Sequence, residues 1–357
     1  MTEPPSAPDG PRGPASIGSD VPAVEGPDDP TAGPPAGPSA SVPALGLFRF
    51  TIEGRQAPGL FVAGWIATLI GGSAAFVGLL SGQNVAGAVL FIAGLALVLP
   101  GLVLLGGSQA IERLHAGLAY TGPSPIVTFL AVVAGWYLAA VAIATPLQLA
   151  GLDITGPAVA LLGVSIQALV VLGILRLMVV GSGALSWRDM GVRRPDGAAV
   201  QDLVWGALFA APVVLVTGVV VLGLVTIIGQ EPASPLPPTG SPGGLALNLL
   251  AGAVIAPLYE ELFFRGFTLT AWLRMTTVRA AIVRSAILFA LIHAIDQTGD
   301  TFTAALGVAI VAAAARLPVA LVLGWVFEQR KSLWASVGLH ATFNAILLVI
   351  AERTLAR

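Results

Sequence analysis

The sequence predicts an all-α fold, a polytopic bundle of about eight or nine helices that cross a lipid bilayer. Hydrophobic residues make up 56% of the 357 residues and charged residues only 10%, whereas a soluble domain is roughly one-quarter charged. Uncharged apolar runs longer than about 18 residues recur along the chain, and such runs are typical of membrane-spanning helices. Each run is expected to be helical, because a lone segment in lipid must satisfy its own backbone hydrogen bonds.

The apolar runs place nine candidate spans, near residues 58–81, 84–107, 125–149, 156–180, 203–228, 244–275, 279–297, 302–328 and 334–351. Loops at alternate ends carry the cations, among them Arg113, Arg188, Arg274, Arg330 and Lys331, and the intervening loops hold Asp153, Glu231, Asp296 and Asp300. Short cytoplasmic loops are enriched in arginine and lysine. We therefore expect an integral protein of the cell membrane with a cytoplasmic N-terminus, although Arg353 and Arg357 do not fit the alternation.

Composition divides the chain into three regions. Residues 1–45 are rich in proline, glycine, serine and alanine and are expected to form a disordered cytoplasmic tail. Residues 46–240 are predicted to hold about five N-terminal spans, and residues 244–351 to hold the chemistry. The absence of cysteine excludes disulfides, thiolate metal sites and a cysteine nucleophile. Nucleic acid is not an expected partner, because there is no basic stripe.

Two adjacent glutamates lie within an apolar run. Ionisable groups inside a span are costly and by default indicate function. Glu261 and Arg265 are four residues apart, so on a helix they share one face and can neutralise each other. Glu260 points roughly 100° away, which leaves it available as a general base or acid. For Glu261 and Arg265, a structural charge network between helices is the alternative interpretation.

A histidine follows in the next apolar run, four residues after Phe289. Glu260 lies 15 residues before the predicted turn at Met275 (275 − 260), and His293 lies 14 residues after Arg279 (293 − 279). At about 1.5 Å of rise per residue, both lie on the order of 20 Å from that turn. Glu260 and His293 are therefore predicted to face each other at similar depth.

His340 and Asn344 share a helix face in the last apolar run, again four residues apart. Together they can donate two hydrogen bonds to one point, as an oxyanion hole requires. A histidine together with a carboxylate from elsewhere can instead bind a metal. A structural hydrogen bond between helices is the third interpretation.

The three clusters together resemble the CPBP family (CAAX proteases and bacteriocin-processing, or Abi, proteins), which includes CAAX prenyl endopeptidases of the Rce1 type. The family pattern is Glu-Glu-x-x-x-Arg, then Phe-x-x-x-His, then His-x-x-x-Asn or Asp. This chain matches it with Glu260, Glu261 and Arg265, with Phe289 and His293, and with His340 and Asn344. The resemblance covers about residues 244–351 and implies a membrane-embedded helical core around a polar cavity.

The resemblance also implies a protease that hydrolyses a membrane-proximal or lipidated peptide. Glu260 and His293 would activate a water, and His340 and Asn344 would stabilise the oxyanion. A divalent metal such as zinc stays open as a cofactor, with Glu260, His293 and His340 as ligands and Glu261 as base. A His-Glu-x-x-His stretch, the commonest zinc-protease motif, is missing.

Two other functions compete with proteolysis. A non-catalytic scaffold or immunity-type protein would use the same cavity to bind a membrane partner. A proton-coupled transporter is less favoured, because the ionisable residues gather in the C-terminal third and the first half has no counterpart to them.

Overall fold

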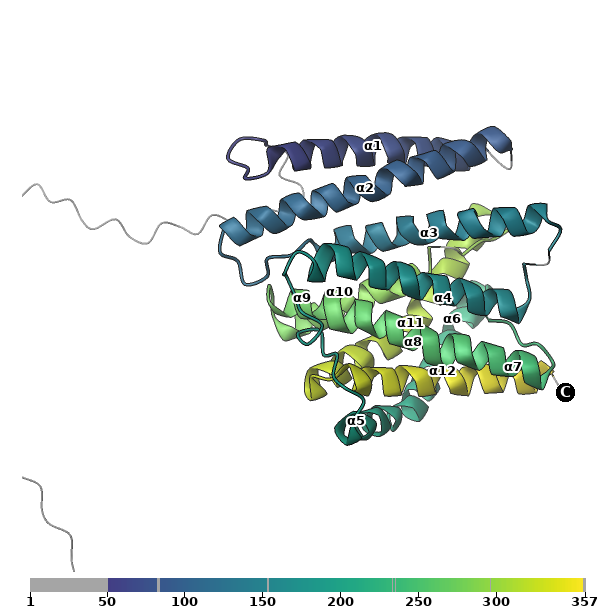
Figure 1. The fold of residues 1–357 in the computed structure, drawn as a ribbon. Coiled ribbons are helices and arrows are strands. Elements are labelled where there is room, and N and C mark those ends of the chain that lie inside the picture. Colours follow the sequence, from purple (N-terminus) through teal and green to yellow (C-terminus); the bar gives the residue numbers. More distant parts are fainter. Residues whose placement is uncertain are drawn as a thin grey trace, which may run out of the picture. The chain divides into compact units, whose positions relative to one another are not determined.

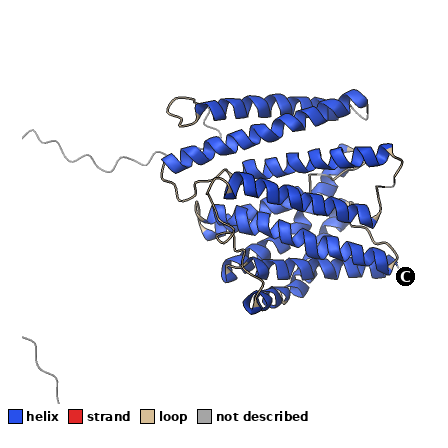
Figure 2. Cartoon of the chain, in the orientation of Figure 1, coloured by secondary structure: helices blue, strands red, loops and turns tan. Residues whose placement is uncertain are grey.

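Every regular element in the described part of the chain is a helix, which confirms the predicted fold class (Figure 2). The computed structural model describes residues 51–81, 84–152, 154–232, 234, 236–295 and 297–355. The predicted tail, residues 1–45, lies outside these ranges.

The helices follow the apolar runs of the sequence in order. They are α1 (Pro58–Leu80), α2 (Val85–His115), α3 (Pro125–Leu149), α4 (Pro157–Ile174), the π-helix η1 (Leu175–Val180), α5 (Gly197–Ala207), α6 (Ala210–Ile228), α7 (Pro242–Leu249), the π-helix η2 (Leu250–Ile255), α8 (Ala256–Glu261), the π-helix η3 (Leu262–Leu269), α9 (Thr270–Leu273), α10 (Val278–Ile292), α11 (Phe302–Arg330) and α12 (Leu333–Leu355).

Local sequence explains where the helices begin. Proline stands in the first turn of α1, α3, α4 and α7, where its missing N–H costs nothing. Side-chain oxygens of Ser124, Asp196 and Thr301 accept from backbone N–H groups in the first turns of α3, α5 and α11. Such caps satisfy donors that have no partner within the helix.

Eight helices in the described residues are long and apolar enough to cross a membrane, one fewer than the nine that the sequence predicts. The difference is α10, predicted as 279–297, whose 15 residues end at Ile292. At about 1.5 Å per residue it spans roughly 22 Å, less than the roughly 30 Å of a hydrocarbon core.

The chain nevertheless changes ends between α9 and α11. Arg274, after α9, lies 3.2 Å from Asp189 in the loop before α5. Arg330, the last residue of α11, donates to Asp202 at 2.7 Å. Loops rich in cations therefore meet at one end of the bundle. Since α11 is a single helix of 29 residues, its first residue lies at the opposite end, and α10 with the loop after it completes the crossing.

Glycines join α1 and α2 into an antiparallel hairpin at one edge of the bundle (Figure 1). They recur every seven residues, about two helical turns, at Gly64, Gly71 and Gly78 in α1 and at Gly87, Gly94 and Gly101 in α2. A Cβ on Gly94 would lie 2.4 Å from the backbone nitrogen of Ala75. Small residues allow this close approach, which is a common way for membrane helices to associate.

A second close crossing joins α5 to α12. A Cβ on Gly206 would lie 1.9 Å from the carbonyl oxygen of Ala335, and a Cβ on Gly338 would lie 2.0 Å from that of Leu203. Beside this crossing, a buried core that includes Val213, Leu323 and Leu339 joins α6, α11 and α12. Helix α12 is therefore fixed from two sides.

Candidate active site

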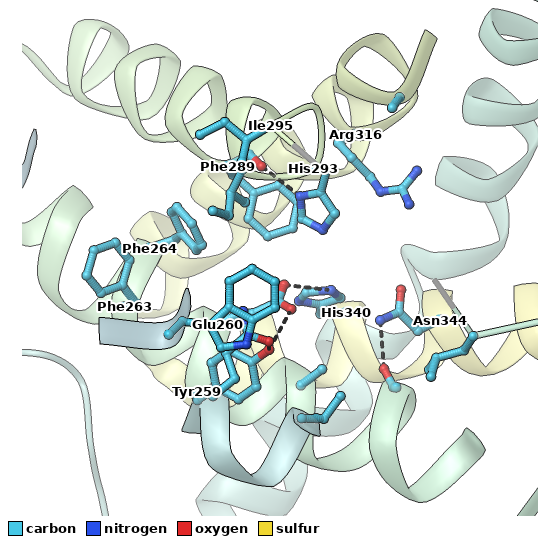
Figure 3. Close-up of a pocket in the computed structure, with 18 of the residues that line it drawn as sticks. Tyr259, Glu260, Phe263, Phe264, Phe289, His293, Ile295, Arg316, His340 and Asn344 are labelled. Carbon is cyan, nitrogen blue, oxygen red and sulfur yellow. Dashed lines mark hydrogen bonds and ion pairs between the residues drawn. The ribbon is translucent and has the colours of Figure 1, made fainter. Parts of the chain in front are cut away.

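A cavity of about 720 Å³ lies among the helices and contains most of the predicted site residues (Figure 3). Its walls come from α3, α4, η2, α8, η3, α10, α11 and α12 and from the loop around Leu236. Most of the lining is apolar. The polar side chains that line it include Gln167, Tyr259, Glu260, His293, Arg316, His340 and Asn344.

The helix that carries the two glutamates departs from regular α geometry. The π-helices η2 and η3 flank the six residues of α8, and Pro257 lies in the first turn of α8. Proline cannot donate to the carbonyl four residues earlier, and a wider turn before it accommodates that loss. Single π turns are frequent at functional sites. Here they bracket Glu260 and Glu261.

Glu261 is fully buried, and its carboxylate contacts the side chains of Arg265 and His340. Its Oε1 accepts from Nη1 of Arg265 at 2.9 Å and lies 2.7 Å from Nδ1 of His340. Arg265, also fully buried, donates from Nη2 to the carbonyl of Ala320 at 3.2 Å and stacks over Phe289 at 4.6 Å. This network joins α8, η3, α10, α11 and α12 around one carboxylate. Such a network is what the structural interpretation of Glu261 and Arg265 predicts, namely a charge network that joins helices.

Glu260 turns away from that network and faces the cavity (Figure 3). Its side chain is 17% exposed. Oε1 lies 3.4 Å from the hydroxyl of Tyr259. Oε2 is buried, has no hydrogen-bond partner among the described residues and lies 3.8 Å from Nε2 of His340. A buried carboxylate oxygen without a partner is costly, so this atom has an unused capacity to accept a hydrogen bond from a water or a substrate group.

His293 lies on the opposite wall of the cavity, at the C-terminal end of α10 (Figure 3). Its Nδ1 lies 2.8 Å from the carbonyl oxygen of Phe289. A carbonyl oxygen can only accept, so Nδ1 carries a hydrogen. In the neutral ring Nε2 then keeps its lone pair and can accept a proton or a hydrogen bond.

His340 and Asn344 lie on the cavity side of α12, as the spacing of four residues predicts. Nδ1 of His340 faces the Glu261 carboxylate, so it is the protonated nitrogen, and Nε2 faces Glu260. Asn344 donates from Nδ2 to the carbonyl of Gly252 at 2.7 Å. The second Nδ2 hydrogen and Oδ1 are then left for the cavity.

Gln167, Tyr259 and Arg316 line the same cavity, although none of them is among the predicted site residues. The Tyr259 hydroxyl donates to Oε1 of Gln167 at 2.6 Å. Figure 3 shows the Arg316 guanidinium to the right of His293 and above Asn344. Polar side chains inside apolar runs are the signal that indicates such residues, and Gln167 and Arg316 both carry it.

The three candidate metal ligands are not arranged as a coordination set. Among the described residues there is no group of three histidine, aspartate or glutamate side chains that could hold a metal ion. Nε2 of His340 lies 3.8 Å from Oε2 of Glu260, a separation that two ligands of one zinc can have, because each lies about 2.0–2.2 Å from the metal. A third ligand that would complete such a group is missing among the described residues. The side chains as placed do not fit the zinc site that the sequence left open.

Comparison with known proteins identifies the region that carries this site. Residues 242–346 match the family described as type II CAAX prenyl endopeptidase, Rce1-like. No curated protein and no solved structure matches the chain. The matched segment runs from α7 into α12 and contains Glu260, Glu261, Arg265, His293 and His340, as well as Asn344. Residues 242–346 are therefore an Rce1-like domain of the type II CAAX prenyl endopeptidase family, within an integral membrane protein.

Proposed function

We propose that the protein is an intramembrane endopeptidase that cuts a membrane-proximal or lipidated peptide in this cavity. The observation that supports it most is that two proton acceptors line the same cavity from different walls. They are Oε2 of Glu260, which has no hydrogen-bond partner among the described residues, and Nε2 of His293. Lipid excludes bulk water, so a hydrolase in a membrane must hold its own water. Two acceptors on facing walls supply that binding site.

The proposed reaction is general acid–base hydrolysis. A water held between Glu260 and His293 gives a proton to Glu260 as its oxygen bonds to the scissile carbonyl carbon. The tetrahedral intermediate then collapses, the C–N bond breaks, and the proton passes from Glu260 to the leaving amine. A group of this kind typically contributes about 10²–10⁴-fold to the rate.

His340 and Asn344 are proposed to stabilise the oxyanion. Asn344 has one Nδ2 hydrogen left beside its bond to Gly252. His340 can donate from Nε2 only as an imidazolium, whose charge the adjoining Glu261 carboxylate would balance. Donors aimed at the developing negative charge act most strongly where water is excluded. Arg265 and Glu261 then have a positioning role, because they hold the His340 ring.

The direct test compares wild type with Glu260→Gln, which preserves shape and removes the proton acceptor. Membrane peptides of cells that express each form would identify cleaved substrates, and liposomes with the purified protein would give the rate. Cleavage is expected to fall by at least about 100-fold. Glu231→Gln, in an exposed loop, is the matched control and should cleave normally. Full cleavage by Glu260→Gln refutes the proposal, and retained substrate binding without any turnover by wild type would support a scaffold instead.

We also infer that the cation-rich end faces the cytoplasm, as the loop charges predict. The cysteine-free sequence permits a simple test with single cysteines. Ser186→Cys, at the cation-rich end, should react with an impermeant thiol reagent only after the cells are opened. Ser241→Cys, beside Glu352 at the other end of α12, should react in intact cells, and the reverse pattern would overturn this orientation.

A further inference from the structure

A hydrogen-bonded chain reaches the proposed base from outside the family domain. The hydroxyl of Tyr259 lies 2.6 Å from Oε1 of Gln167 and 3.4 Å from Oε1 of Glu260. Gln167 belongs to α4, whereas Tyr259 and Glu260 belong to α8. Tyr259 is 6% exposed, so its hydroxyl lies where an unmade hydrogen bond is expensive.

The chemistry of the two side chains explains what such a chain accomplishes. A tyrosine hydroxyl has one hydrogen, so it can donate to only one of its two neighbours at a time. When it donates to Gln167, its oxygen can accept from a protonated Glu260. When the glutamine amide turns and donates from Nε2, the hydroxyl can donate to the Glu260 carboxylate. Glutamine is able to take both parts because its amide has both an acceptor and donors.

We propose that Gln167 is a positioning residue for Glu260 and that it acts through the Tyr259 hydroxyl. This inference rests on the proposed hydrolase function. It assigns Oε1 of Glu260 to Tyr259 throughout the reaction and leaves Oε2, which has no protein hydrogen bond among the described residues, for the water. Because Glu260 first takes up a proton and later gives it away, a partner that both accepts and donates keeps the carboxyl group in one place at each stage.

The inference also gives α4 a part in the reaction. Other residues of α4 that line the cavity, among them Ala160, Gly163 and Val164, are apolar. Burying a glutamine amide in an apolar wall is costly unless the amide makes a hydrogen bond. The hydrogen bond of Gln167 to the Tyr259 hydroxyl meets this need and joins α4 to the residue next to Glu260. A family domain without this helix would lack that contact.

The test measures kcat and KM for peptide cleavage by the full-length protein in liposomes. Gln167→Leu and Tyr259→Phe are each expected to lower kcat by about 10-fold, the effect of one lost hydrogen bond of ordinary strength, with KM within about twofold. The double variant should fall no further than Tyr259→Phe alone, because both changes interrupt one chain. Gln167→Glu, which can accept from the hydroxyl but as a carboxylate cannot donate to it, should also lower kcat.

Ser165→Ala is the matched control on the same helix. Its hydroxyl donates to the carbonyl of Leu161 at 2.8 Å within α4, so kcat should be unchanged. A wild-type kcat in Gln167→Leu, or losses that multiply in the double variant, would overturn the inference. If Gln167→Leu does not fold, the Gln167→Glu and Tyr259→Phe pair decides in the same way. Failure of the hydrolase proposal is seen separately, as full activity in Glu260→Gln.

Discussion

Gly338→Ala tests whether the position of one helix controls the site. The new Cβ would lie 2.0 Å from the carbonyl oxygen of Leu203 and 2.7 Å from its carbonyl carbon. Real Cβ atoms essentially never approach closer than 3.0 Å. The neighbour is backbone rather than a flexible side chain, so α5 and α12 must separate by at least 1.0 Å (3.0 − 2.0).

That separation falls two residues before His340, whose Nδ1 is 2.7 Å from Glu261. A displacement of about 1 Å at a reacting group can cost on the order of 10²-fold in rate. The overpacking itself is expected to destabilise the protein by about 1–3 kcal/mol. Alanine is a better helix former than glycine by about 1 kcal/mol, so intrinsic helix propensity would act in the opposite direction.

The assay is peptide cleavage in liposomes, with thermal unfolding in detergent measured on the same samples. Gly223→Ala is the matched control, because a Cβ added to this glycine of α6 would meet nothing within 4 Å. The control should keep its activity and stability. If Gly338→Ala cleaves within about threefold of wild type and unfolds at the same temperature, the close crossing does not position His340 and the reasoning fails.

Three further predictions concern other parts of the structure. Gly94→Ala should lower the unfolding temperature, because its Cβ would meet the Ala75 backbone at 2.4 Å. It should leave kcat nearly unchanged, because the described residues that line the cavity include none from α1 or α2. A large fall in kcat at unchanged stability would contradict this prediction. Arg265→Leu should destabilise by about 3–5 kcal/mol, since it leaves the buried Glu261 short of a partner, and a folded yield equal to wild type would argue against that. Zinc chelators should leave cleavage intact, since the described side chains form no group that could hold a metal, and loss of cleavage that zinc restores would reverse this expectation.

Much of the site follows from sequence because short-range rules dominate there. The spacing of four between Glu261 and Arg265 predicts a pair on one helix face, and the structure has that pair at 2.9 Å. The nearly equal distances of Glu260 and His293 from the predicted turn, 15 and 14 residues, predict similar depth, and both line one cavity. The resemblance to endopeptidases of the Rce1 type, which rests on the three motifs, is confirmed by the family match over residues 242–346. For the ion pair and the shared depth, helix geometry and chain order suffice, whereas the family assignment rests on the motif pattern.

Contacts between helices distant in sequence are harder to predict. Nothing local indicates that Gly206 on α5 meets α12, or that Gln167 on α4 reaches Tyr259. Both depend on how the helices pack, which periodicity along one segment does not encode. The early end of α10 is a different case, because the contact there is local: the Phe289 carbonyl accepts from the His293 ring, and the helix stops there although the apolar sequence continues to Ile295.

The helices before residue 242 also determine where a chimera of this protein and a relative can be joined. The cavity wall on α3 and α4, and the crossing of α5 over α12, belong to segments that the family domain does not include. A chimera joined at the start of α7 would carry all the motif residues and still pair them with a foreign wall. A chimera meant to transfer substrate specificity should therefore be joined ahead of α3, so that α3 and α4 are transferred with the family domain. The α1–α2 hairpin can be left out of the transferred segment.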